Sequence, residues 1–248
     1  MKIECRVEAC LIGDSLCTIP FILHLAKNNE VYVTGDMPDS VRELCRGMPF
    51  LFIDAPPSVD KTYVLNCNQA WQWDNKNDWL YSMAQSYFGL YEFAIGGIQP
   101  ISFCIHEVDL PPGIVISPFA RSDGAFTKRW PVEKWQEFIE LCKHRAPIYV
   151  LGSHEDDMEP FWTAGATPIQ GWHLPSVLKL ILTSKVFVSI DTGTSHLAGL
   201  AGFNRHVLIY PNGLPRNWAE YKTARVVKGA TNHAISVESV YTAVKDFI

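Results

Sequence analysis

The amino-acid sequence predicts an α/β protein with parallel β-sheets, divided into two domains. Short apolar runs typical of buried strands alternate with segments of helical periodicity, an order that favours parallel sheets. A charged stretch with two prolines, His106–Gly113, interrupts this pattern and is followed by a new apolar run. We therefore predict one domain at residues 1–110, a second at residues 111–235 and a terminal helix at 236–248.

The first domain is expected to begin with a βαβ unit. The expected elements are a strand at Ile3–Ala9, a helix around Leu16–Lys27, and strands at Glu30–Thr34, Phe50–Ile53 and Thr62–Leu65. A polar segment with Trp71, Trp73 and Trp79 follows, and then an apolar helix around 79–91. These tryptophans either stack on a sugar or base or pack beside a loop.

The second domain repeats the alternation of strands and helices. Its expected elements are strands at Ile114–Ser117, Ile148–Leu151, Val186–Ile190 and His206–Tyr210, and helices at Pro131–His144, Leu174–Thr183 and Ser195–Gly202. Proline suits the first turn of a helix, and the helical spacing of Trp135 and Phe138 places Trp135 in the core. The last helix has Val237, Val240 and Val244 on one face and Ser236 as its cap.

Composition and charge favour a small-molecule partner. The 248 residues are 48% hydrophobic, as in ordinary globular proteins, and carry a formal net charge of −5. This charge and the lack of a Lys/Arg run argue against a broad electrostatic contact with nucleic acid. The composition does not exclude peripheral contact with a membrane.

The cysteines and apolar runs predict a cytoplasmic protein without a metal site. Seven cysteines form an odd set with no Cys-x-x-Cys pair, which suggests neither a disulfide framework nor a zinc site. No apolar run approaches the roughly 20 residues that span a bilayer. The first residues lead into a strand pattern rather than a signal peptide.

The strongest functional signal is the expected strand Val186–Ile190, which runs directly into Asp191-Thr192-Gly193-Thr194-Ser195-His196. Gly193 permits close approach of a ligand to the backbone, and Thr194 or Ser195 can cap the following helix. The unpaired N–H groups of that helix attract an anion such as phosphate, while Asp191 at the strand tip is free to bind hydroxyls. The alternative is an ordinary strand-to-helix turn.

The longer pattern Asp-Thr-Gly-x-Ser-His-Leu-Ala, residues 191–198, resembles the donor-site motif of glycosyltransferase family nine, the heptosyltransferase-like enzymes. This resemblance implies the GT-B fold, in which two Rossmann-like domains face a cleft. It also implies a nucleotide-diphosphate-sugar as co-substrate, no separate cofactor, and a saccharide or other hydroxyl acceptor. The terminal helix is implied to pack back toward the first domain.

Two more segments resemble motifs of the same family. Gly13-Asp14 followed by Pro20 is similar to its amino-terminal segment, in which the acid is the candidate general base; the alternative for Asp14 is a helix N-cap. Lys128-Arg129-Trp130-Pro131 is similar to the family's Lys-x-Trp-Pro, and implies that Lys128 neutralises donor phosphate. Asp14 and Lys128 are therefore the candidate catalytic residues.

The remaining candidates would bind the donor. A loop with Ser117, Arg121 and Ser122 lies where the family contacts phosphate. The segment Gly152-Ser153-His154-Glu155-Asp156 resembles the family's Gly-x-x-x-Glu segment, whose acid binds ribose; Glu155 is assigned this role, with the adjacent Asp156 as an alternative. His196 is expected to touch phosphate or orient Asp191. The full donor-binding set is Ser117, Arg121, Ser122, Lys128, Glu155, Asp191, Thr192, Gly193, Thr194 and His196, with no metal ligand.

These features predict an inverting, metal-independent glycosyltransferase with a shortened first domain. One alternative is a phage-type or tailoring enzyme that glycosylates a modified nucleobase in DNA or another acceptor, although the acidic net charge weighs against nucleic acid. Another is a non-catalytic nucleotide-sugar-binding module, against which Asp14, Lys128 and Asp191 argue together. A GT-B epimerase would need further acids in the cleft.

Overall fold

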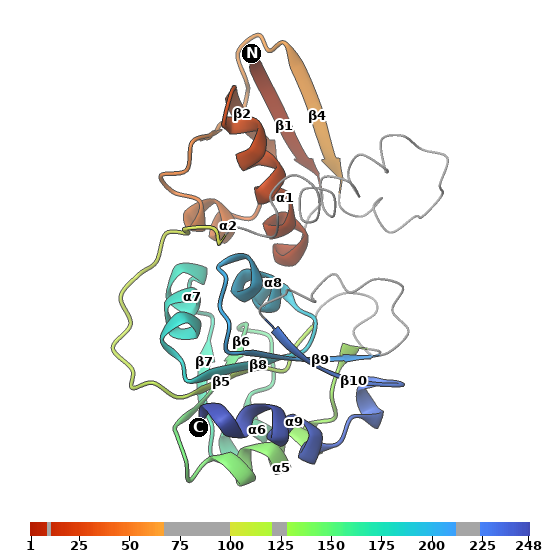
Figure 1. Cartoon of the computed structure of the whole chain (residues 1–248). Helices are drawn as coiled ribbons and strands as arrows, with labels where there is room; N and C mark the ends of the chain where they lie inside the picture. Colours follow the sequence, from red (N-terminus) through yellow and green to blue (C-terminus); the bar gives the residue numbers. More distant parts are fainter. Residues whose placement is uncertain (9–10, 67–99, 121–127, 212–223) are drawn as a thin grey trace. The chain divides into compact units, whose positions relative to one another are not determined.

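The computed structural model describes residues 1–8, 11–66, 100–120, 128–211 and 224–248 (Figure 1). The chain divides into two units, Met1–Cys104 and Ile105–Ile248, each with its own parallel sheet. The division precedes the expected boundary after residue 110, because Val108 and Leu110 pack against the apolar core of the second unit. No helix in these ranges is long and apolar enough to cross a membrane.

The first unit contains a four-stranded sheet of order β3-β2-β1-β4. Its elements are β1 (Lys2–Glu8), α1 (Ile12–Ala26), β2 (Glu30–Gly35), α2 (Asp39–Leu44), β3 (Leu51–Phe52) and β4 (Lys61–Asn66). Helix α1 begins at Ile12 rather than near Leu16, so Gly13 and Asp14 lie in its first turn. The expected tryptophan-rich segment and the helix around 79–91 lie outside the described residues.

One face of the first sheet is apolar and the other carries a polar network. Ile3, Cys5 and Val7 of β1 are buried on the first face. Helix α1 packs there, because Phe21 meets the ring of Tyr63, the register partner of Cys5, with ring centroids 5.3 Å apart. Apolar and polar residues therefore alternate strictly along β1, whereas a strand that is buried on both faces is apolar throughout.

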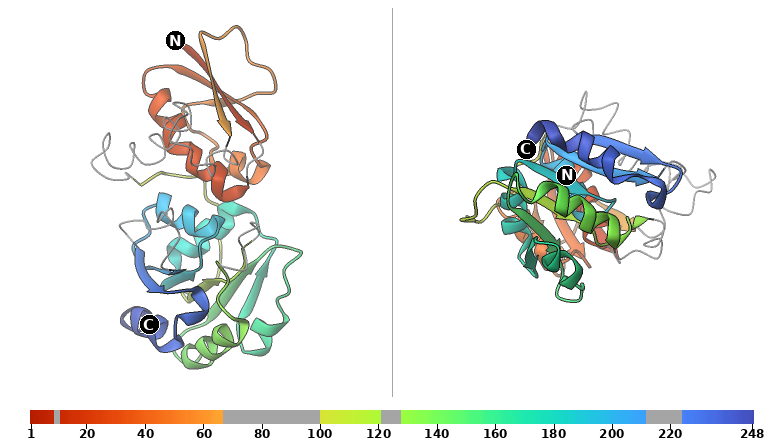
Figure 2. Two further views of the ribbon diagram at one scale, coloured as in Figure 1. Left: turned by 90° about the vertical axis from the view of Figure 1, so that its right-hand side faces the viewer. Right: turned by 90° about the horizontal axis from the view of Figure 1, so that it is seen from below.

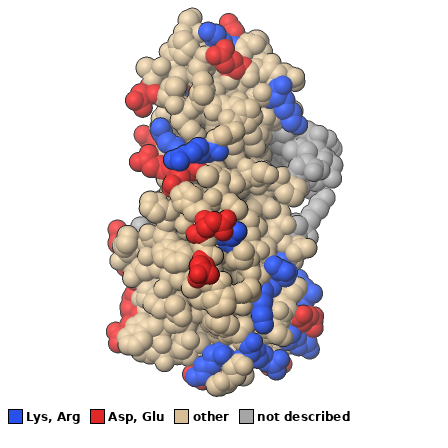
Figure 3. Space-filling model, turned by 90° about the vertical axis from the view of Figure 1, so that its left-hand side faces the viewer, with Lys and Arg blue, Asp and Glu red and all other residues tan. Residues whose placement is uncertain are grey.

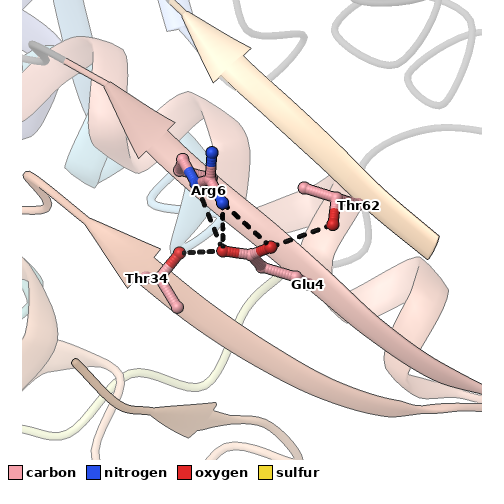
Figure 4. A network of polar contacts seen from close by, with 4 residues as sticks. All are labelled: Glu4, Arg6, Thr34 and Thr62. Carbon is pink, nitrogen blue, oxygen red and sulfur yellow. Dashed lines mark hydrogen bonds and ion pairs between the residues drawn. The ribbon is translucent and has the colours of Figure 1, made fainter. Parts of the chain in front are cut away.

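Glu4 is the centre of the polar face (Figure 4). Its residue is 3% exposed, and its carboxylate accepts hydrogen bonds from Thr34 of β2 at 2.8 Å and Thr62 of β4 at 2.9 Å. The Arg6 guanidinium donates to the same group at 3.1 Å. Burial raises the pKa of Glu4, but the three donors outweigh burial and the net pKa is lowered. The central strand is thus linked to both neighbours through one carboxylate.

The second unit contains a six-stranded parallel sheet of order β10-β9-β8-β5-β6-β7. Its strands are β5 (Ile114–Ser117), β6 (Ile148–Gly152), β7 (Thr167–Gln170), β8 (Val186–Ser189), β9 (His206–Pro211) and β10 (Ala224–Gly229). Its helices are α5 (Val132–Cys142), α6 (Glu159–Thr163), α7 (Leu174–Thr183), α8 (Gly193–Leu200) and α9 (Val237–Val244), with short 3₁₀ turns at Asn232–Ala234 and Lys245–Phe247. Helix α7 has the expected bounds, whereas α6, β7 and β10 were not expected.

Both faces of the second sheet are covered (Figures 1 and 2). Helices α5, α6 and α9 close one apolar core, which contains Trp135 as expected. Helices α7 and α8 contribute to the other. Helix α9 lies beside α5 and buries Val237, Val240 and Val244 in the core of this unit, so the terminal helix is part of the second unit.

Substituting Glu4→Gln is expected to destabilise the protein by about 1.5–3 kcal/mol at pH 7, since hydrogen bonds to a charged acceptor are lost. The folded pKa of Glu4 is lowered, so its contribution is present above the unfolded value of about 4.3 and is lost as the pH falls through the folded pKa. Urea denaturation measures the free energy of unfolding of both proteins at pH 7 and at pH 3, and so gives the effect of the substitution at each pH. The control is Glu137→Gln on the exposed face of α5. An equal effect at both pH values would contradict the prediction.

Candidate active site

The candidate site forms where the strand order of the second sheet reverses. From β5 the chain proceeds through β6 and β7 on one side and then crosses to β8 on the other. In open parallel sheets, ligands bind outside the carboxyl ends of the strands at such a switch point. Ser117 ends β5, and Asp191 follows the carboxyl end of β8 after one further residue. The expected strand-to-helix motif therefore lies at this edge.

Asp191 is buried and engaged by two side chains. Its residue is 6% exposed; Lys128 Nζ lies 2.8 Å from Oδ2 and His196 Nε2 lies 3.4 Å from Oδ1. Burial raises the pKa of this carboxyl, but the hydrogen bond and charge of His196 and the charge of Lys128 outweigh it and hold the pKa well below its usual range. Asp191 is thus an ionised group held between two partners, not the free strand-tip acid expected from the sequence.

Helix α8 begins at Gly193, two residues after Asp191. Thr192 is its N-cap in extended conformation, so the helix starts two residues earlier than expected and neither Thr194 nor Ser195 is the cap. The Ser195 hydroxyl accepts from the Thr192 N–H at 3.1 Å and donates to the Thr192 carbonyl at 2.6 Å. Gly193 is the first helical residue. The start of α8 is therefore fixed by its own side chains, beside the buried carboxylate.

A pair of hydroxyls joins β5 to this helix. Ser117 Oγ and Thr194 Oγ1 are 2.8 Å apart, which brings two of the predicted donor-binding residues together at the switch point. Arg121 and Ser122, from the same predicted loop as Ser117, lie outside the described residues.

The turn after β6 distinguishes Glu155 from Asp156. Asp156 Oδ2 accepts from the N–H of Ser153 at 2.6 Å and from its hydroxyl at 2.7 Å, so this carboxylate closes the turn. Gln170 at the end of β7 donates to the carbonyls of the same turn. Glu155 lies exposed at the tip of the turn. Asp156 therefore has a structural role in this turn, whereas Glu155 lies on the exposed side of it.

Lys128 is held at its main chain by a residue that the sequence did not indicate. The side-chain amide of Asn232 donates to the Lys128 carbonyl. Asn232 lies in a short polar turn 104 residues further along the chain, and no spacing or motif connects the two in the sequence. The Lys128 side chain is 14% exposed, so most of it is buried beside Asp191.

Asp14 belongs to the first unit, whereas the other described candidates belong to the second. It is the third residue of α1, and the N-cap of that helix is Leu11. The N-cap alternative for Asp14 is therefore wrong. A carboxylate in the first turn still interacts favourably with the positive end of the helix dipole.

Lysine and arginine side chains on the face shown in Figure 3 form small groups rather than one continuous patch. Among the residues that the structure describes, no group of three His, Cys, Asp or Glu side chains is arranged to hold a metal ion.

Comparison with solved structures gives the same fold at low sequence identity. ADP-heptose lipopolysaccharide heptosyltransferase II from E. coli superposes with a TM-score of 0.67 at 17% identity, covering 100% of this chain and 98% of that one. The E. coli heptosyltransferase WaaC with ADP gives 0.69 at 13% identity, covering 100% of both chains. The iron-containing dodecameric glycosyltransferase TibC from enterotoxigenic E. coli gives 0.66 at 15% identity, covering 91% of this chain and 61% of that one.

Family comparison agrees with the motifs at the carboxyl edge of the second sheet. No curated protein sequence matches the chain. The family model described as glycosyltransferase family 9 (heptosyltransferase) matches residues 104–242, more than half of the 248 residues and nearly the whole second unit. The two-sheet α/β architecture is that of GT-B glycosyltransferases. The chain is therefore a GT-B glycosyltransferase that belongs to family 9.

Proposed function

We propose that this protein transfers a sugar from a nucleotide-diphosphate-sugar to an acceptor hydroxyl, with inversion and without a metal ion. The observation that carries the proposal is the cluster of Lys128, Asp191 and His196 beside the first turn of α8, at the switch point of the second sheet. The cluster combines a cation, a helix N-terminus and small hydroxyl residues, which is the chemistry that binds a diphosphate.

Lys128 would stabilise the departing diphosphate. Its ammonium group lies 2.8 Å from Asp191, beside the first turn of α8, where a positive charge stabilises phosphate oxygens. In this arrangement Asp191 serves chiefly to hold Lys128 and His196, and its role toward donor-sugar hydroxyls stays a prediction. Ser117, Thr192, Gly193 and Thr194 would complete the phosphate site with hydroxyl and backbone donors.

Glu155 would bind the ribose of the donor. It lies in the turn that follows β6, at the carboxyl edge of the same sheet. A carboxylate can accept hydrogen bonds from two adjacent hydroxyls, which is the pattern a ribose presents. Because Asp156 is engaged by Ser153, Glu155 is the carboxylate of this turn to which we assign that role.

Asp14 would act as general base. In a single displacement, it takes the proton of the acceptor hydroxyl, the acceptor oxygen bonds to the anomeric carbon, and the bond to the diphosphate breaks with inversion. General base catalysis contributes about 10²–10⁴-fold to such a step. The resemblance of the segment around Gly13 and Asp14 to the family's amino-terminal motif supports this assignment. The acceptor would be a saccharide, as the names of the heptosyltransferase relatives suggest.

Lys128→Met is expected to weaken binding of nucleoside diphosphates about tenfold or more, because a charge-assisted contact to phosphate is lost. Calorimetric titration with ADP, GDP, UDP, CDP and dTDP measures the effect and identifies the base. The control Lys179→Met removes a lysine of α7 that pairs with the exposed Glu107, and should leave affinity unchanged. If no nucleotide binds to the unsubstituted protein, the chain is not the donor-binding enzyme proposed here.

Asp14→Asn is expected to lower the rate of transfer by about 10²–10⁴-fold while leaving nucleotide affinity unchanged, since the base is lost and the donor site is not touched. The measurement is transfer of labelled sugar from the donor identified by calorimetry. The matched control is Asp39→Asn, which removes an exposed acid from the first turn of α2 and loses the same kind of helix-dipole interaction. Equal rates for the two variants would show that Asp14 is not the base.

Transfer is expected to persist after exhaustive treatment with EDTA, because Lys128 and the N–H groups of α8 would carry the charge stabilisation that a metal supplies elsewhere. Metal analysis of the treated protein verifies removal. The anomeric configuration of the product, read by NMR, tests inversion in the same reaction. Loss of activity that is restored by one metal ion would contradict metal independence. The iron-containing TibC would then be the more suitable relative for comparison of the mechanism.

A further inference from the structure

We propose that Asn232 is a positioning residue for Lys128, and that it fixes the lysine before the diphosphate of the donor arrives. This inference rests on the proposed role of Lys128. Asn232 lies after β10, outside the sequence motifs that contain the candidate site residues.

The contact joins Asn232 to the main chain of the lysine itself. Asn232 is 0% exposed and opens the 3₁₀ turn Asn232–Ala234. Its amide nitrogen donates to the Lys128 carbonyl, and within the described residues its buried Oδ1 has no hydrogen-bond partner. An asparagine buried with an unsatisfied acceptor costs free energy, so packing alone does not account for it. Among the residues that the structure describes, the side chain of Asn232 forms its hydrogen bond with Lys128.

The turn that carries Asn232 is itself firmly attached to the segment after Lys128. Trp130 Nε1 donates to the Ile235 carbonyl at 3.0 Å. Lys134 Nζ donates to the carbonyls of His233 at 2.7 Å and Ile235 at 2.8 Å. The segment 128–134 is thus bound to one turn at three of its residues, which makes the turn a rigid support.

Glycine at position 229 permits this turn to lie close to the end of β10. A Cβ added there would come within 2.7 Å of Ile235 Cγ1 and 3.2 Å of the Thr231 carbonyl oxygen. The Thr231 hydroxyl in turn caps the 3₁₀ turn by accepting from the Ala234 N–H at 3.2 Å. The local geometry of 229–235 therefore fixes Asn232 relative to the sheet.

The consequence for Lys128 is that both ends of its side chain are restrained. The main chain is held by Asn232 and the ammonium by Asp191, 2.8 Å away. An unrestrained lysine side chain has many rotamers, and binding would otherwise have to remove part of that entropy. Restraint before binding reduces that cost, and a donor group already in place stabilises developing charge without reorganisation.

The test is a double-mutant cycle on nucleotide affinity. Asn232→Ala alone is expected to weaken binding of the best nucleoside diphosphate about fivefold to tenfold. In the Lys128→Met background the same substitution is expected to have no further effect, because its action passes through Lys128. A purely structural effect would instead give the same loss in both backgrounds.

A stability-matched control separates positioning from general damage. Ser236→Ala removes the N-cap of α9, four residues along the chain, and is expected to lower the melting temperature without weakening nucleotide binding. Thermal denaturation compares it with Asn232→Ala.

The outcomes distinguish this inference from the proposed function. If Lys128→Met leaves affinity unchanged, the proposed role of Lys128 is wrong and the inference falls with it. If Lys128→Met weakens binding but Asn232→Ala does not, or if the two effects add in the double variant, only the positioning role of Asn232 is wrong.

Discussion

The buried ion pair between Lys128 and Asp191 is the interaction on which the site depends. Its two side chains are 14% and 8% exposed, so both charges have lost most of their hydration. The desolvation cost of such a pair can exceed its electrostatic gain, and the pair is weak evidence for stability. Its value lies in orientation: it places an ammonium group at the carboxyl edge of the sheet, next to the N-terminus of α8, and keeps the carboxylate ionised.

The two sheets differ in how many of their faces are covered by apolar packing. In the second unit, β5, β8 and β9 read as nearly continuous apolar runs because helices cover both faces. In the first unit, β1 alternates strictly, and α1 packs on its apolar face while Glu4 joins three strands on the other. Hydrogen bonds to one carboxylate thus hold the strands together on the polar face, and side-chain packing holds them together on the apolar face.

Much of the fold could be predicted because its signals are local. The apolar run Val186–Ile190 and the helical spacing of α5 and α7 each lie within a few residues, and their bounds were close to those observed. Short elements escaped prediction: α6 and β7 are five and four residues long, and β7 has mostly exposed side chains. Such segments show too few periods of hydrophobicity for a pattern to emerge.

By itself the sequence determined which residues stand at strand ends, because an apolar run followed by Asp191, glycine and a helical pattern has few other solutions. Tertiary structure alone decided the state of those residues. Asp191 is paired rather than free because folding brings Lys128 to it, and Lys128 is held by Asn232, 104 residues away. Hydrogen bonds between distant segments depend on how the elements pack, and no local pattern of residue types records that packing.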